Sequence, residues 1–122
     1  MSHNSEISKR NKAFDKKYEE ERYCRGCGCN FPLSRAHIIA VSKRKDLELD
    51  INNMRYLCMD YLGKKGCHSI WDSGTNEERH KLKCFDEFIE YIISKDGEHW
   101  HYNITEGSHR FFLGKKEIKL IK

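Results

Sequence analysis

The sequence predicts a small α+β domain that is held together by a metal ion, and three observations lead to this prediction. Six cysteines occur among 122 residues, of which only 38% are hydrophobic and 34% are charged, so the apolar core must be small. Two short β-prone runs lie near the cysteines, and a longer segment behind them repeats its apolar residues every three or four positions. A chain of this length fits one domain, and a small core favours stabilisation by a structural metal ion.

Composition and charge limit the classes of protein to which this chain can belong. No apolar run approaches the length of a membrane span, and no basic-then-apolar leader follows the opening residues MSHNSEISKRNK, so we expect a cytoplasmic protein. In a reducing compartment, closely spaced cysteines are more often metal ligands than disulfides. The net charge of +4 arises mainly from residues 23–72, which carry eight basic and five acidic side chains. This mild excess is weak support for nucleic-acid binding.

We divide the chain into a polar N-terminal arm, a cysteine-rich core and a C-terminal extension, at residues 1–22, 23–75 and 76–122. In the arm, the spacing of Phe14 and Tyr18 predicts either a solvated helix or a frayed segment. The core offers strand candidates over residues 36–41 and 54–58, followed by a short helix that begins at Cys67.

The spacing of apolar residues changes in the C-terminal extension. Apolar residues recur there at helical spacing, which predicts one amphipathic helix over residues 76–93. Ser73 or Thr75 is placed to cap this helix, and Asp96-Gly97 ends it. Loose alternation towards the C-terminus predicts a hairpin around Gly114.

Four of the cysteines form two pairs with the spacing of metal ligands. Cys24 and Cys27 form a C-x2-C turn, and the Gly28 that follows is typical of a zinc knuckle, in which backbone N–H groups point at thiolates. Cys58 and Cys67 form a second, wider pair around a loop. Because zinc prefers four soft ligands at tetrahedral angles, the two pairs together predict one structural zinc site.

Other arrangements of the thiols are possible. Free cysteine is among the most buried residue types, so four unrelated core thiols are the simplest alternative, which the C-x2-C-G turn disfavours. Cys29 could replace Cys27 as a ligand, although a C-x4-C turn is looser. Cys84 lies in the predicted long helix, where we expect it to be an ordinary core residue.

Three further residues stand in a definite order relative to the cysteine pairs. His37 lies in the apolar run AHIIAV, Asn53 lies just before the second β-prone run, and His68 directly follows Cys67. Nested within the two cysteine pairs, this order resembles the HNH endonuclease family, and the stretch AHIIAVSKRKDLELDINNMRYLC looks most like the small HNH proteins of phage genomes. The resemblance spans residues 24–72 and implies a ββα-metal core, in which a hairpin precedes a helix.

The resemblance implies a metal-dependent endonuclease that hydrolyses DNA phosphodiester bonds and leaves 5′-phosphate and 3′-hydroxyl ends. His37 would be the general base, and Asn53 would tie the following loop and so orient His37. His68 would ligate a single catalytic divalent ion, Mg²⁺ or another metal. The four-cysteine zinc would be structural, DNA would be the partner, and the protein would act in the cytoplasm of a bacterium, encoded by it or by a phage.

One position departs from the family pattern. Many family members carry Asp or His as a metal ligand directly before the general base, but this chain has Ala36 there. Asp72, one helical turn after His68, could supply an oxygen ligand or be a surface carboxylate. The loss at Ala36 motivates an alternative, a non-catalytic zinc-ribbon module that binds nucleic acid. The basic run at residues 43–45 is either a solvated loop or a phosphate contact.

Overall fold

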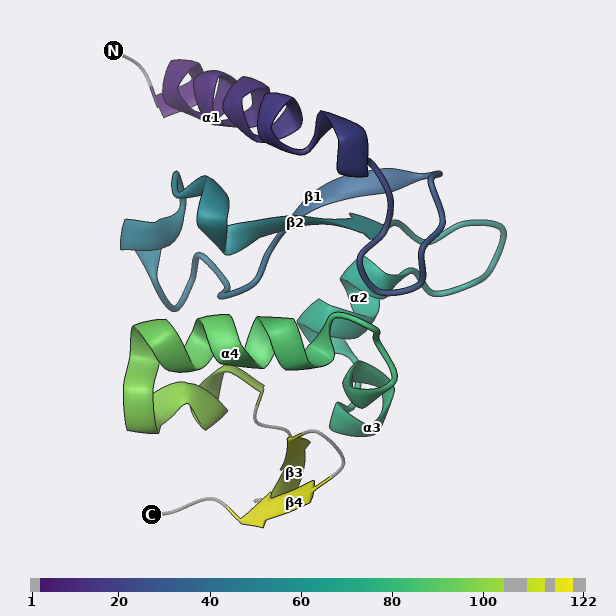
Figure 1. Cartoon of the computed structure of the whole chain (residues 1–122), viewed down its shortest axis with the longest axis vertical. Helices are drawn as coiled ribbons and strands as arrows, with labels where there is room; N and C mark the ends of the chain where they lie inside the picture. Colours follow the sequence, from purple (N-terminus) through teal and green to yellow (C-terminus); the bar gives the residue numbers. More distant parts are fainter. Residues whose placement is uncertain (1–2, 105–109, 114–115, 120–122) are drawn as a thin grey trace.

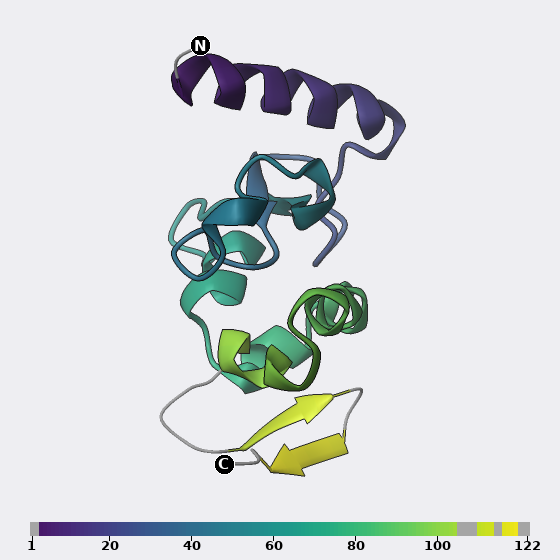
Figure 2. The same ribbon diagram turned by 90° about the vertical axis from the view of Figure 1, so that its left-hand side faces the viewer.

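The computed structural model describes residues 3–104, 110–113 and 116–119. It is an α+β arrangement, as predicted, in which a two-stranded hairpin is covered by helices on both sides (Figure 1). Helix α1 lies on one side of this hairpin, whereas α2 and α4 lie on the other, and a second small hairpin lies at the far end (Figures 1 and 2). No helix in the described part of the chain is long and apolar enough to cross a membrane.

The N-terminal arm is a helix that packs on the central hairpin. Helix α1 spans His3–Lys17 and continues into the short 3₁₀ helix η1, Glu19–Glu21. Its Phe14 is fully buried and meets the ring of Tyr56 edge-on, with 4.8 Å between ring centroids. Of the two predicted alternatives, the solvent-exposed helix is therefore the one found, and Phe14 is its buried contact with the hairpin.

The central hairpin consists of β1, Leu33–His37, and β2, Met54–Cys58. The strands are antiparallel, with Leu33 opposite Cys58 and His37 opposite Met54. Strand β2 has the predicted bounds, but β1 begins earlier than the predicted run and ends at His37. Its apolar continuation, residues 38–41, leaves the sheet and enters the loop, where Ile38 and Ile39 are buried.

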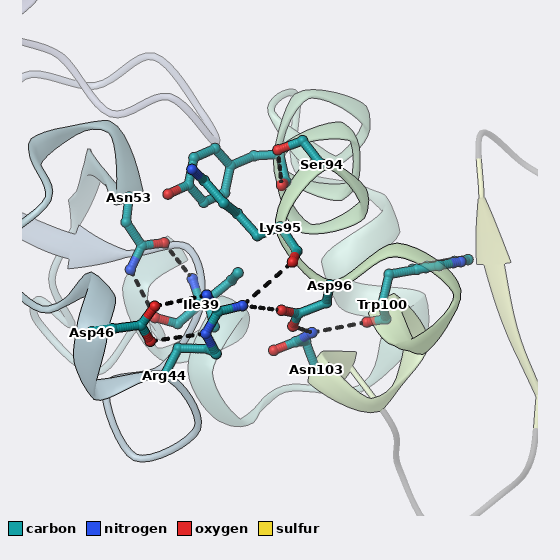
Figure 3. A network of polar contacts seen from close by, with 10 residues as sticks. Ile39, Arg44, Asp46, Asn53, Ser94, Lys95, Asp96, Trp100 and Asn103 are labelled. Atoms are coloured by element: carbon teal, nitrogen blue, oxygen red, sulfur yellow. Dashed lines mark hydrogen bonds and ion pairs between the residues drawn. The ribbon is translucent and has the colours of Figure 1, made fainter.

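The loop between the strands is held against the C-terminal helices. It contains two 3₁₀ helices, η2 at Lys45–Leu47 and η3 at Ile51–Asn53. Figure 3 shows the Arg44 guanidinium from this loop between the carboxylates of Asp46 and Asp96. Asn103 donates a further hydrogen bond to Asp96, at 2.8 Å. The loop is therefore fixed by polar contacts as well as by burial.

The predicted helix over residues 76–93 is two helices, α3 at Asn76–His80 and α4 at Phe85–Asp96. Thr75 caps α3 and forms a reciprocal capping box with Glu78, so one of the two predicted caps is confirmed. Between the helices, the Lys83 N–H donates to the carbonyl of Gly26 at 3.0 Å instead of continuing the helix. The break therefore comes from a contact with the cysteine turn, which periodicity does not reveal.

Of the remaining elements, α2 and the terminal hairpin were predicted, whereas the 3₁₀ helix η4 replaces the loose alternation expected after His99. Helix α2, Cys67–Ser73, begins at the predicted cysteine, and η4, Gly97–Ile104, follows α4. The predicted terminal hairpin is present as β3, Arg110–Leu113, paired with β4, Lys116–Lys119, while Gly114 at its predicted turn lies outside the described residues. The main core lies between β2, α2 and α4 and is centred on the following buried side chains: Leu57, Trp71, Phe88, Ile89 and Ile92.

Candidate metal centre and adjacent histidine pocket

The two cysteine pairs come together in one cluster. The sulfur atoms of Cys24, Cys27, Cys58 and Cys67 all lie within 4.8 Å of one another, and this is the only such group of His, Cys, Asp or Glu found in the described ranges. Three of the four are buried, and Cys27 is exposed. The Sγ atoms of Cys27 and Cys58 are 3.8 Å apart. A tetrahedral ion with metal–sulfur bonds of about 2.3 Å requires sulfurs about 3.8 Å apart, so these residues are positioned to hold a metal ion.

Three glycines make the two cysteine turns possible. Gly28 has φ +91°, a conformation that favours glycine, as its place after the C-x2-C turn predicts. Gly26 is required for space, because a Cβ there would lie 2.8 Å from the Cys67 sulfur. Gly66, which directly precedes Cys67, is more tightly enclosed, since its Cβ would lie 2.4 Å from the Cys58 carbonyl oxygen. The sequence signal for Gly26 and Gly66 is that a glycine stands beside each cysteine pair.

Backbone amides support the cluster electrostatically. The N–H groups of Gly26 and Cys58 each donate to the Cys24 sulfur at 3.3 Å, and the Cys67 N–H donates to the Cys58 sulfur at 3.2 Å. A hydrogen bond from the Cys67 thiol, aided by these amides, lowers the pKa of Cys24 to about 4. The same contact raises the pKa of Cys67, and burial raises the pKa of Cys58 to about 12. A cation among these sulfurs would replace the protons that the two raised thiols retain.

The two remaining cysteines lie outside the four-sulfur group. Cys29 is partly buried beside the cluster, and burial raises the pKa of its thiol. Cys84 is buried in the main core at the N-cap of α4, as an ordinary core residue would be, and burial raises its pKa to about 12.

His68 lies at the start of α2, on the rim of an open pocket. Its Nε2 is 3.0 Å from an Asp72 carboxylate oxygen, one helical turn on. Its Nδ1 is 2.7 Å from the Ser34 hydroxyl, which itself donates to the carbonyl of Leu57. The hydrogen bond to Asp72 raises the pKa of His68, although burial acts against it. The pocket has a volume of about 370 Å³, and its lining also includes the Asp60 side chain.

Asp60 and Ser34 are two contributors that the sequence analysis missed. Asp60 accepts hydrogen bonds from the Gly66 N–H at 2.7 Å and the Ser69 hydroxyl at 2.8 Å, which close the loop before α2 and lower the Asp60 pKa. Ser34 meets His68 only because β1 pairs with β2, so no local pattern identifies it.

His37 lies at the end of β1 and points to the loop that follows. Its Nε2 lies 3.1 Å from the carbonyl oxygen of Glu48, so this ring nitrogen is the donor. The same carbonyl accepts a hydrogen bond from Arg10 of α1 at 2.9 Å. His37 is therefore on the side of the hairpin that α1 covers.

Asn53 ties the loop to itself, as the resemblance implied. The side chain is fully buried; its oxygen accepts from the Ile39 N–H at 2.8 Å, and its nitrogen donates to the Ile39 carbonyl at 3.0 Å. Its backbone carbonyl also accepts from the N–H of Ile38, directly after His37. Figure 3 shows the two bonds between Asn53 and Ile39. Together with the bond to Ile38, they set where the chain leaves β1, and hence the position of the His37 backbone.

The hairpin does not bring His37 and His68 onto one face. Successive side chains of a strand point to opposite faces, so Ser34 and Ala36 face one way and His37 faces the other. Ser34 contacts His68, and Ala36 belongs to the core beneath α2 and α4. His37 lies opposite Met54, which packs with the aromatic cluster under α1.

The basic run at residues 43–45 is largely engaged within the protein. Arg44 binds Asp46 and Asp96, and Lys43 donates to the carbonyl of Tyr102 at 2.6 Å (Figure 3 shows the Arg44 contacts). Lys45 is exposed, and its amino group forms no ion pair within the described residues. The run is therefore mainly a structural tie between the loop and the C-terminal helices.

Comparison with known proteins finds no match, whether among protein-family models, curated proteins or solved structures. What this site can do must therefore be argued from its own residues.

Proposed function

We propose that this protein is a metal-dependent endonuclease of the HNH type, which hydrolyses DNA phosphodiester bonds and is stabilised by a structural zinc ion. The observation that carries the proposal is the Cys67-His68 pair at the start of α2. One residue closes the four-sulfur cluster, and the next places an imidazole beside a carboxylate in an open pocket. The hairpin, its Asn53-tied loop and α2 follow one another in the order of a ββα-metal core.

The four-cysteine site fits zinc in a structural role. Thiolates are soft ligands that zinc prefers, and the sulfur spacing suits tetrahedral coordination. Because four protein ligands complete that coordination, no position remains for substrate or water. The ion would join the turn at Cys24, the end of β2 and the start of α2.

The residues around His68 fit a second, catalytic cation. The Ser34 hydroxyl donates to Leu57, so it accepts from His68 Nδ1. A cation that displaces the proton between His68 Nε2 and the Asp72 oxygen would find one nitrogen and one oxygen donor there. A divalent ion held there would neutralise charge on the phosphate in the transition state. Ala36 contributes no ligand atom, so substrate phosphate would have to complete the shell.

His37 has the hydrogen-bonding arrangement of a general base. Its Nε2–H donates to the Glu48 carbonyl, so in the neutral ring Nδ1 carries the free lone pair that can accept a proton from water. Asn53 acts through the backbone and is a positioning residue, since its side chain is buried and bonded to Ile39.

One observation favours a second candidate function, a non-catalytic zinc module that binds nucleic acid. The strand directs His37 towards α1, while His68 lies on the opposite face of the hairpin. Together with Ala36, this separation is expected of a zinc-stabilised fold that no longer has a complete catalytic site.

Nicking of supercoiled plasmid DNA in Mg²⁺ and in Mn²⁺ tests the proposal. We expect the zinc-loaded protein to nick, and His37→Ala to lower the rate by about 10²- to 10⁴-fold, the usual contribution of a general base. Asp72→Asn should raise the Mg²⁺ concentration needed for half-maximal rate. His99→Ala, which alters an exposed histidine on η4, is the matched control and should nick at the wild-type rate.

The same assay separates the two candidates. DNA binding without nicking in any divalent ion would refute the nuclease and support the binding module. Nicking that survives His37→Ala unchanged would refute the role of His37 alone.

A further inference from the structure

A pocket of about 650 Å³ opens beside the cysteine cluster, next to the pocket of His68. Two aromatic side chains stand on its rim and are strongly exposed, Phe31 by 68% and Tyr61 by 50%. Their rings meet edge-on, with 5.7 Å between centroids. Lys64 and Lys81 also line the pocket. We name these four residues the aromatic–lysine platform.

The platform is built on chain that is held rigidly. Tyr61 and Lys64 exchange two backbone hydrogen bonds, of 3.0 and 2.9 Å, which close the tip of the loop between β2 and α2. The base of that loop is closed by Asp60, and the Met59 N–H donates to the carbonyl of Pro32, next to Phe31. The two loops that carry the rings therefore lie side by side (Figure 1). Rings presented in this way lose little entropy when a ligand stacks on them.

Lysines outnumber acidic side chains by three to one in the lining of the pocket. Lys65 is paired with Glu78 at 3.2 Å, and Glu78 is the single acidic residue among the pocket-lining residues. The amino groups of Lys64 and Lys81 take part in no ion pair within residues 3–104. Two cations therefore remain available beside two exposed rings.

Met59 lines both pockets, so the platform is continuous with the site of His68 and Asp72. A chain-like ligand lying across the platform can extend over Met59 to the histidine pocket. A compact ligand would occupy only one of the two.

We propose that the aromatic–lysine platform binds an unpaired single strand of nucleic acid, with bases stacked on Phe31 and Tyr61 and phosphates next to Lys64 and Lys81. Exposed aromatic faces combined with cations along a groove are the arrangement that binds single strands without sequence preference. That the bound nucleic acid extends towards the His68 pocket rests on the proposed nuclease function. The binding itself does not.

A protein partner is the other class of macromolecule that exposed aromatic residues attract. Lysine is depleted at the cores of protein–protein interfaces, where its desolvation is unfavourable. On this surface, Lys64 and Lys81 line the same pocket as the two rings, which favours a polyanion.

The test measures the affinity of the zinc-loaded full chain for a labelled single strand of about 15 nucleotides, by fluorescence anisotropy without added Mg²⁺. We expect Phe31→Ala with Tyr61→Ala to weaken binding on the order of tenfold or more, because each stacked base contributes substantially. Lys64→Ala and Lys81→Ala should each reduce the slope of log K against log salt by about 0.7. Tyr61→Phe should bind like the wild type, since stacking needs only the ring.

Matched controls use residues of the same type and exposure elsewhere. Tyr102→Ala alters a tyrosine that is 52% exposed, and Lys12→Ala alters an exposed lysine of α1; both should leave strand affinity unchanged. Zinc content and thermal unfolding equal to the wild type would show that the platform variants are folded.

Three outcomes would overturn the proposal: single-strand affinity unchanged in the double aromatic variant, an unchanged salt slope in both lysine variants, or tighter binding of a duplex that needs neither ring. Self-association that disappears in the aromatic variant, with strand affinity unchanged, would assign the surface to a second copy of this chain instead. Plasmid nicking by the wild type together with unaltered strand binding by the variants would leave the nuclease standing and refute the platform. Single-strand binding that is lost in the platform variants, without nicking by the wild type in any divalent ion, would support the platform and refute the nuclease.

Discussion

Asn53 shows how much one side chain can determine in this fold. It is fully buried, and its amide bonds both backbone groups of Ile39 across fourteen residues of sequence. The neighbouring Asn52 is exposed, and its side chain accepts a hydrogen bond from Lys17 at 2.8 Å. Two adjacent residues of the same type thus differ in role because only one of them points into the loop.

We expect Asn53→Ala to lower the free energy of unfolding by about 2–4 kcal/mol, because the Ile39 N–H and carbonyl lose their buried partners. Asn52→Ala should cost less than about 1 kcal/mol, since its bond to Lys17 is solvent-exposed. Urea denaturation of the zinc-loaded protein measures both values. Equal costs for the two substitutions would contradict the structural role given to Asn53.

Among the elements, α1 depends on tertiary contacts rather than on its own sequence. Besides Phe14, it is attached by Asp15, whose carboxylate binds Arg35 at 2.9 Å and accepts from the Tyr56 hydroxyl at 2.6 Å. The Arg35 guanidinium lowers the pKa of Asp15. The helix therefore completes the cover over the face of the hairpin on which His37 lies.

Phe14→Ala should lower the free energy of unfolding by about 3 kcal/mol, because a fully buried ring leaves a cavity. Hydrogen exchange should then lose protection first over α1, whereas the metal content should stay at the wild-type value, since no ligand lies in that helix. Phe31→Ala is the control of the same residue type, and its exposed ring predicts almost no change in stability. Unaltered exchange over α1 in Phe14→Ala would refute this account of its docking.

The break between α3 and α4 is the clearest error of prediction at the scale of elements. In one continuous helix, the Lys83 N–H would donate to Arg79, four residues earlier. It donates instead to Gly26, while Lys81 and Phe85 donate to carbonyls three residues earlier. The apolar residues that predict the helix begin at Leu82, in the break, and continue in α4, whereas the buried residues of α3 are Asn76 and Arg79. Periodicity reports which face is buried and not whether the backbone is continuous.

At the scale of the whole molecule, the four-cysteine cluster joins parts that are distant in sequence. Its cysteines come from the turn at residues 24–27, the end of β2 and the start of α2. The Gly26 carbonyl extends the connection to the segment before α4. A metal ion there would contribute to the stability of the entire core and not only of one turn.

Elemental analysis of the purified protein should therefore find about one zinc per chain, and a strong chelator should unfold the core, measured by circular dichroism. Cys27→Ser should reduce the zinc content and the unfolding temperature. Cys29→Ser, which alters the thiol two positions on and outside the cluster, should retain both. Retention of zinc by Cys27→Ser together with its loss in Cys29→Ser would show that Cys29, and not Cys27, is the fourth ligand. Absence of bound metal in the wild type would refute the site.

The sequence by itself determined the α+β class, the four cysteines that cluster, the bounds of β2 and the start of α2. These depend on local properties, namely the spacing of the cysteines, the positive φ of Gly28 and a short β-prone run. Only the tertiary structure decided that α1 docks, that the long helix is interrupted and that Arg44 binds acids of this chain. It also decided that His37 and His68 point to opposite faces of the hairpin. Each of these depends on contacts between residues far apart in the chain, which no local pattern records.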